Sequence, residues 1–383
     1  MWQAARLALG TASALGLARF AYGLLLPAMR DDLGWSLAAA GAMSTANGLG
    51  YLVGALVTAA VVRRWGVTAA FRAGMAGTAA SLAATAVSGD FAVLLAVRAV
   101  AGATGAVVFV TGGVIASRLA TRLGSGTPVT VYFAGAGLGI AFGGVVIPVL
   151  GDAWRVAWVV LGVAAGVATL VSWTAARDGG AVATGTAGRA RVRPLWRAAV
   201  AYLMFAVGYI TYITFLSAYL RDRAAPTGQV VLTWAALGLA VVAAPALWSR
   251  PIGHWPGARA LAVLLVVLGG GAGLALVSPA PVAVLASALV YGATFMGVPA
   301  AITALIRTTV PAVDWTATLA AFTTVFAAGQ TAGPWLAGLV ADRTSTDATL
   351  VWTAVLCAAA AVVAAPFGRR APAGAPGRAR GRG

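Results

Sequence analysis

Two arginines stand inside strongly apolar stretches of the chain. Arg19 lies within residues 16–29, which read GLARFAYGLLLPAM, and Arg98 lies near the start of a later apolar stretch. A charge at the centre of a membrane-spanning helix costs about 2.5–3.5 kcal/mol on insertion scales, so such a side chain faces a protein partner, a water-filled space or a solute. No Asp or Glu stands inside an apolar stretch to balance the two charges. Because guanidinium groups bind anions through charge-assisted hydrogen bonds, the pattern favours an anionic or strongly electronegative solute.

Tyrosines and amides in other apolar stretches are further candidates for this site. Those that could bind a solute by stacking or hydrogen bonding are Tyr22, Tyr209, Tyr212, Tyr291, Asn47 and Gln330. Aromatic residues recur every three or four positions along 202–219, which places them on one face of a helix. Three alternatives stay open: the aromatic face could serve packing, the amides could join neighbouring helices, and the arginines could bond to backbone carbonyls and nearby hydroxyls.

The composition assigns the chain to the integral membrane proteins. Hydrophobic residues make up 61% of its 383 residues and charged residues 9%, with a mean hydropathy of +0.92. A net charge of +17 would suit a nucleic-acid binder, but the basic residues are scattered between apolar stretches and form no stripe. We therefore expect a small-molecule solute and the lipid bilayer as partners, no nucleic acid, and a monomer.

Apolar stretches of about the ~20 residues needed for a membrane helix recur along the whole chain. They span 4–28, 37–62, 67–88, 91–117, 127–150, 155–175, 197–220, 230–248, 260–277, 282–306, 316–340 and 349–367. The sequence thus predicts an all-α membrane protein with twelve transmembrane helices in two pseudo-symmetric six-helix bundles. Parallel repeats of this kind are a known transporter plan, and the motif Gly-Ala-Thr at 102–104 recurs at 292–294.

The arginines in the loops predict the orientation of these helices. If both termini are cytoplasmic, the arginines left on the outside are only Arg30, Arg155, Arg221, Arg223 and Arg343. The positive-inside rule therefore predicts a multi-pass protein of the inner (plasma) membrane with both ends in the cytoplasm. At 1.5 Å per residue, Arg19 and Arg98 would then both lie roughly 10–14 Å below the outer face, in one layer.

Polar segments divide the chain into four parts. We expect an N-terminal bundle at 1–175, a cytoplasmic linker at 176–196, a C-terminal bundle at 197–367 and a disordered basic cytoplasmic tail at 368–383. The linker is rich in Gly, Ala, Thr and Arg and shows no helical periodicity.

Three glycine-rich segments resemble motifs of the major facilitator superfamily. They are RAVAGATGA from Arg98, GAGLGIAFGG from Gly135 and GQTAGPWLAGLVAD from Gly329. The opening GLARFAYGLLLPAM, together with STANGLGYLVGAL in the second apolar stretch, resembles the YbfB/YjiJ type within that superfamily.

The resemblance implies alternating access, in which two six-helix halves rock around a central cavity lined by helices 1, 4, 7 and 10. It also implies hinge or gating roles for Gly102, Gly135, Gly139, Gly333 and Pro334. One departure concerns the loop after helix 2, where the superfamily usually has an Asp-Arg pair. Arg63 and Arg64 stand there with no acid, which puts an inward-side charge clasp of the usual kind in doubt.

These patterns favour a secondary active or facilitative transporter that moves a small organic solute, anionic or aromatic, across the inner membrane. A multidrug-type efflux carrier and a non-transporting membrane sensor are the alternatives. One histidine, His254, and one cysteine, Cys357, leave few groups for acid-base or metal chemistry. We therefore expect no enzyme, no catalytic residue, no metal site and no cofactor, and the coupling ion stays open.

Overall fold

Helices are the only regular secondary structure in the part of the chain that the structure describes. The computed structural model describes residues 1–177 and 188–365, and no strand occurs among them. The prediction of an all-α fold is confirmed for this part of the chain. The expected tail at 368–383 and the central part of the expected linker lie outside the described residues.

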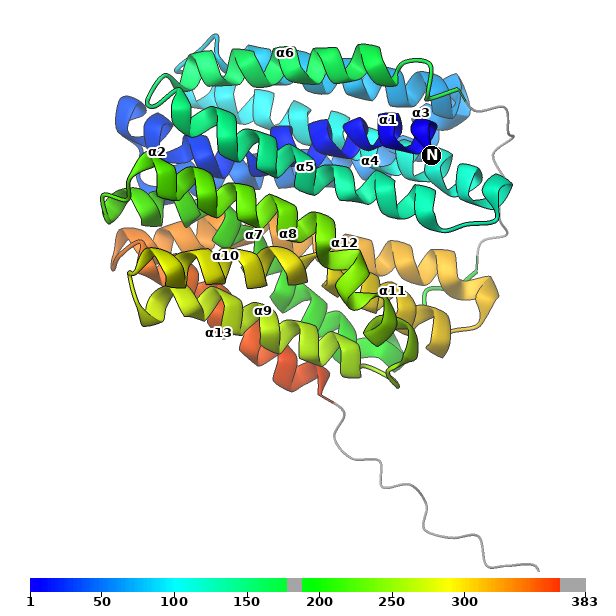
Figure 1. Cartoon of the computed structure of the whole chain (residues 1–383). Helices are drawn as coiled ribbons and strands as arrows, with labels where there is room; N and C mark the ends of the chain where they lie inside the picture. Colours follow the sequence, from blue (N-terminus) through cyan, green and yellow to red (C-terminus); the bar gives the residue numbers. More distant parts are fainter. Residues whose placement is uncertain (178–187, 366–383) are drawn as a thin grey trace, which may run out of the picture.

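The N-terminal half runs from the first helix to residue 177. Its elements are α1 (Trp2–Thr11), the π-helix η1 (Ala12–Phe20), α2 (Tyr22–Leu33), α3 (Leu37–Thr85), α4 (Phe91–Leu123), α5 (Thr127–Val149) and α6 (Trp154–Ser172). The first three follow one another without a loop and form one continuous apolar rod. In Figure 1 this half occupies the upper part of the molecule.

The C-terminal half contains the remaining helices. Its elements are η2 (Arg193–Leu195), α7 (Trp196–Asp222), α8 (Thr227–His254), α9 (Arg259–Val277), α10 (Pro281–Phe295), α11 (Gly297–Thr309), η3 (Ala312–Asp314), α12 (Trp315–Asp342) and α13 (Asp347–Ala364). Both halves have many apolar side chains on the surface, as expected for helices surrounded by lipid. The boundaries of two separate bundles stay a prediction.

Ten helical segments of the described residues are long and apolar enough to cross a membrane. One of them, α3, would measure about 73 Å at 1.5 Å per residue, more than twice the hydrocarbon thickness of a bilayer. It is interrupted at Gly66, whose φ of 80° and ψ of 163° are not helical. A count of twelve crossings requires that both arms of α3 cross separately and that α12 also crosses, so this number stays a prediction.

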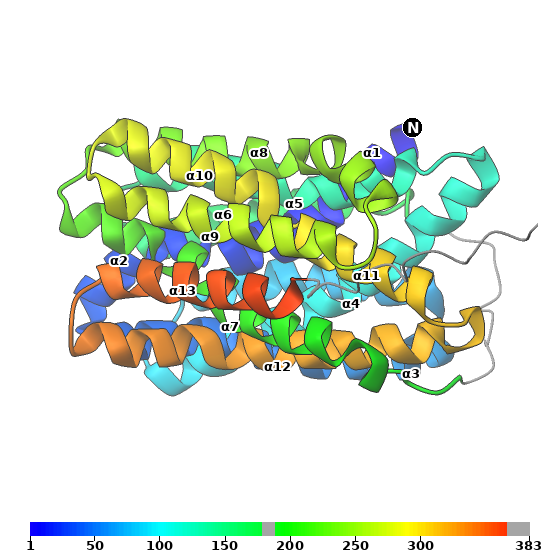
Figure 2. The same ribbon diagram turned by 90° about the horizontal axis from the view of Figure 1, so that it is seen from below.

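The two halves meet mainly along three pairs of helices. The pairs are α3 with α12, α5 with α8, and α2 with α7. Figure 2 shows α3 and α12 side by side along one edge of the molecule. At these contacts glycines bring backbones together: a Cβ at Gly41 would collide with the carbonyl oxygen of Pro334, and one at Gly338 would lie 2.5 Å from that of Leu37.

These contacts are concentrated towards one end of the molecule. We call it the far end, because it lies opposite the N-terminus and the end of α13 (Figure 1). Every polar contact between the two halves that is found among the described residues lies between the far end and the level of Arg19. In contrast, α11 packs on helices of its own half. The halves are therefore joined at the far end and in the middle of the molecule.

Candidate functional site

Arg19 lies where the two halves meet. Its side chain is 7% exposed, and its Nη2 donates a hydrogen bond of 2.6 Å to Oε1 of Gln330 on α12. It belongs to the π-helix η1, in which the backbone N–H of Ala21 bonds to the carbonyl of Gly16, five residues earlier. Such segments change which side chains share a helix face and occur often at functional sites. The first membrane rod thus presents Arg19 to the opposite half.

Two tyrosines complete the polar group around Arg19. Tyr209 on α7 donates a hydrogen bond of 3.0 Å to the same Gln330 oxygen. The guanidinium carbon of Arg19 lies 5.3 Å from the ring centre of Tyr51 on α3. Nε of Arg19 and Nε2 of Gln330 are buried and have no hydrogen-bond partner among the described residues. We call Arg19, Gln330, Tyr209 and Tyr51 the polar cluster.

Aromatic rings stack against the polar cluster on the side that faces away from the far end. The ring of Tyr209 lies 4.9 Å from that of Phe205 and 5.4 Å from that of Phe326, centre to centre, with interplanar angles of 18° and 25°. Tyr202 continues the stack, 5.1 Å from Phe326. Phe205 stands four residues before Tyr209, and Phe326 four residues before Gln330. Both α7 and α12 end at the far end, where Arg221 and Asp342 lie. The stack therefore leads from the polar cluster towards the side where the halves are not joined.

Tyr212 and Tyr291 lie deeper in the C-terminal half. Their rings stack at 3.9 Å, and both side chains are fully buried. The hydroxyl of Tyr212 shares a hydrogen bond of 2.7 Å with Ser287, and that of Tyr291 donates to the backbone carbonyl of Tyr209. Both hydroxyls are therefore already bonded, and Tyr291 helps to position Tyr209 through the backbone.

Arg98 occupies different surroundings from Arg19. It is 1% exposed, and its guanidinium carbon lies 5.1 Å from the ring centre of Tyr22 and 5.2 Å from that of Trp158, both in the N-terminal half. None of its three side-chain nitrogens has a hydrogen-bond partner among the described residues. The hydroxyl of Tyr22 donates to the carbonyl of Ala40, 2.7 Å away. Arg98 is thus held by two aromatic faces in the interior of one half.

The remaining predicted residues make contacts between helices. The amide of Asn47 donates to the backbone carbonyl of Arg98 at 3.2 Å, as in the alternative in which amides join helices. A Cβ at Gly102 would collide with the carbonyl oxygen of Asn47, so no larger residue fits between α3 and α4. A Cβ at Gly135 or Gly139 would likewise collide with the backbone of the first rod, at Ala8 and Ala12 respectively.

The same close approach recurs in the C-terminal half. A Cβ at Gly333 would collide with the carbonyl oxygen of Val207 on α7. Pro334 lies within α12 at the contact with Gly41. These five positions therefore serve tight packing in the structure, and their hinge role stays a prediction.

Ion pairs join the two halves at the far end. Arg221, near the end of α7, bonds to Asp31 at 2.9 Å and to Asp152 at 2.7 Å, both in the N-terminal half. A second link uses the carboxylate of Asp342, the last residue of α12. It accepts hydrogen bonds from the backbone N–H groups of Leu37 and Ala38, at 2.7 and 2.9 Å. A negative charge is favourable at this position, the N-terminus of α3, because of the helix dipole.

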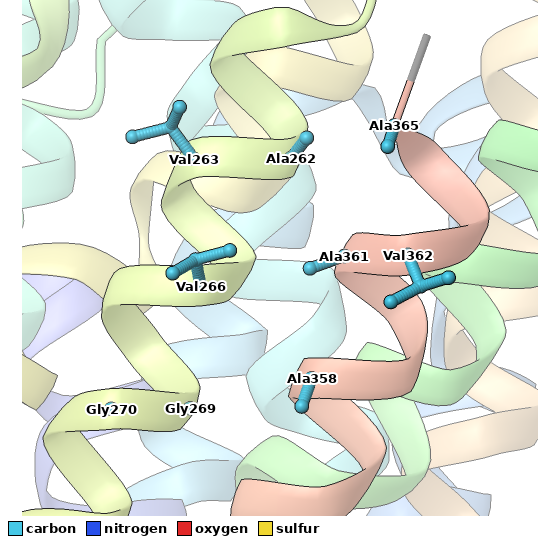
Figure 3. Close-up of a pocket in the computed structure, with 9 residues that line it drawn as sticks. All are labelled: Ala262, Val263, Val266, Gly269, Gly270, Ala358, Ala361, Val362 and Ala365. Atoms are coloured by element: carbon cyan, nitrogen blue, oxygen red, sulfur yellow. The ribbon is translucent and has the colours of Figure 1, made fainter. Parts of the chain in front are cut away.

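A groove of about 500 Å³ lies between α9 and α13, away from the polar cluster. Figure 3 shows that only alanines, valines and glycines line it, among them Val263, Val266 and Val362. It offers no side-chain hydrogen bond or charge that could orient a solute. Such a surface suits lipid chains rather than a selective site.

Sequence reasoning missed three residues of these surroundings: Tyr51, Phe326 and Trp158. Tyr51 lies four residues after Asn47, and Phe326 four residues before Gln330, so helical spacing from the predicted amides could have found both. Nothing in the sequence marked Trp158, which reaches Arg98 from α6.

The arrangement combines an interior cation, an interface between two halves and a polar cluster built from helices of both. A family model described as "Uncharacterised MFS-type transporter YbfB" matches residues 11–367. The chain belongs to this family. It is therefore a multi-pass membrane transporter of the major facilitator superfamily, as its motifs predict.

Solved structures with the same fold include the nucleoside transporter NupG. It is 16% identical, covers 94% of this chain and 97% of its own, and gives a TM-score of 0.66. A mutant form of NupG is 15% identical, covers 94% of this chain and 98% of its own, and gives a TM-score of 0.71. At this level of identity the likeness concerns the fold. No curated protein matches the chain in sequence.

Proposed function

We propose that the protein carries a small organic solute with an anionic or acceptor-rich group across the inner membrane by alternating access. The observation that carries this proposal is Arg19, a buried cation that reaches from one half to Gln330 in the other. Every aspartate of the described residues lies at a helix end or in a loop, so no carboxylate balances this charge. A bound solute that supplies negative charge would do so.

The contacts between the halves support the mechanism. Polar links and close glycine contacts join them at the far end, and the aromatic stack leads from Arg19 towards the opposite side. In the predicted orientation the far end faces outwards, so this arrangement corresponds to a carrier closed on the outside. Opening the far end would break these links and reverse the access to Arg19.

The test is transport by purified protein in proteoliposomes. The panel contains an aromatic acid, an aliphatic acid, a neutral nucleoside and an aromatic amine, with currents recorded on a solid-supported membrane and uptake of labelled solutes measured in parallel. We expect saturable transport of an acidic solute and a loss of at least tenfold in Arg19→Gln. Arg64→Gln, which changes an exposed arginine, is the matched control. Unchanged transport by folded Arg19→Gln protein would refute the proposal.

A further inference from the structure

The polar cluster contains two buried donors that lack an acceptor, Nε of Arg19 and Nε2 of Gln330. They are neighbours, because each is bonded to the same carbon as an atom of the 2.6 Å hydrogen bond between the two side chains. A buried donor left unbonded costs about 1–3 kcal/mol. The feature therefore points to a ligand that supplies acceptors at this place.

The orientation of the Gln330 amide decides which kind of ligand fits. Its Oε1 accepts from Nη2 of Arg19 and from the hydroxyl of Tyr209, so both of its acceptor positions are used. The reversed amide would turn an NH₂ group towards the guanidinium, donor against donor. The NH₂ group must therefore point elsewhere, and it adds a second donor to the free one of Arg19.

A carboxylate matches two neighbouring donors best. It has two acceptor oxygens and no donor, and its charge balances the guanidinium. A neutral amide brings one acceptor together with two donors of its own, which would face Nε and Nε2 unfavourably. A cation would be repelled by Arg19.

The aromatic stack defines the rest of the ligand. Phe205 and Phe326 lie nearly parallel to Tyr209, whose hydroxyl is itself part of the polar cluster. A flat ring joined directly to a carboxylate would place its face on this stack while its oxygens reach the two donors. Stacked aromatic pairs contribute beyond their buried area.

We propose that the transported solute is a small aromatic carboxylate, bound by Nε of Arg19 and Nε2 of Gln330 against the stack formed by Tyr209, Phe205 and Phe326. This inference rests on the proposed function and specifies its solute. Because the carboxylate would accept from Arg19 on one half and from Gln330 on the other, binding would add a second link between the halves beside the existing hydrogen bond.

The first test compares four probes by isothermal titration and thermal shift: benzoate, benzamide, cyclohexanecarboxylate and uridine. Benzoate should bind at least tenfold more tightly than each of the others, since benzamide lacks the charge, cyclohexanecarboxylate lacks the flat ring and uridine lacks the carboxylate. Equal or tighter binding of any of the three would overturn the proposal. If these probes fail but another solute shows Arg19-dependent transport, the inference falls and the proposed function stands. If no solute depends on Arg19, both fall.

The second test uses Gln330→Glu, which places a carboxylate of the protein beside Arg19. We expect this variant to melt at a higher temperature and to lose benzoate binding by at least tenfold, because its own carboxylate takes the place of the solute. Thr324→Ala, on the exposed face of the same helix, should leave both unchanged. Wild-type affinity for benzoate in folded Gln330→Glu protein would overturn the proposal, and so would a lower melting temperature.

Discussion

Asp342→Asn should shift the molecule towards a state that is open at the far end. The carboxylate of Asp342 accepts from two backbone N–H groups at the start of α3, at 2.7 and 2.9 Å, and thereby connects the two halves. Asparagine has nearly the same shape but no charge, and its single carbonyl oxygen replaces two carboxylate oxygens. The change therefore removes the charge and one hydrogen bond without leaving a gap.

The size of the effect follows from these two losses. A charge at an exposed helix N-terminus contributes about 0.3–1 kcal/mol. A hydrogen bond contributes about 0.5–1.5 kcal/mol. Their sum, about 0.8–2.5 kcal/mol, changes the ratio of closed to open molecules roughly 4- to 70-fold. Salt should reduce the difference, because exposed charges are screened.

The assay is the distance between spin labels at the far end, one on each half. Val87 and Val277 are 85% and 82% exposed and suit replacement by cysteine, while the native Cys357 is buried. In Asp342→Asn we expect a larger population with long distances. The control is Asp90→Asn, because Asp90 bonds in the same way to the start of α4 but within one half. If Asp342→Asn and Asp90→Asn give the same distribution of distances, the hydrogen bonds to Asp342 do not hold the far end closed.

Three further outcomes are expected. Arg98→Met should stabilise the protein by about 1–3 kcal/mol in thermal unfolding, since the loss of an unpartnered buried charge outweighs the lost contacts with aromatic faces; a lower midpoint would contradict this. A hydrogen bond from the backbone N–H of Arg189, and after it one from the guanidinium of Arg191, hold the pKa of Asp314 below its usual range. Because the folded pKa is lowered, this contact should be complete at neutral pH and lost as the pH falls below about 4. Hydrogen exchange of the Arg189 amide checks this, and in Asp314→Asn the acid-dependent change should vanish. Gly41→Ala should lengthen the far-end distances, because its Cβ meets the backbone of α12, whereas Gly126→Ala, with nothing near, should not.

Residue types and their periods determined much about this protein before any contact was known. The apolar stretches predict helices because the bilayer requires every backbone group to bond within its own segment. The cost of a charge in lipid singled out Arg19 and Arg98, and an amide inside an apolar stretch marked Gln330 as a candidate. The motifs predict the superfamily, since glycines at close helix contacts leave a visible pattern.

The pairing of side chains across the halves was decided by the tertiary structure alone. Arg19 and Gln330 are 311 residues apart, and a helical period does not say which two faces meet. The π-helix, with its backbone bond from Ala21 to Gly16, turns Arg19 towards α12, and no residue pattern announces it. Arg98 has the same chemistry and a similar predicted depth, yet the rings of Tyr22 and Trp158 enclose it. Composition and spacing placed two cations in the membrane interior, but the rotation and packing of the helices decided that one of them faces the opposite half.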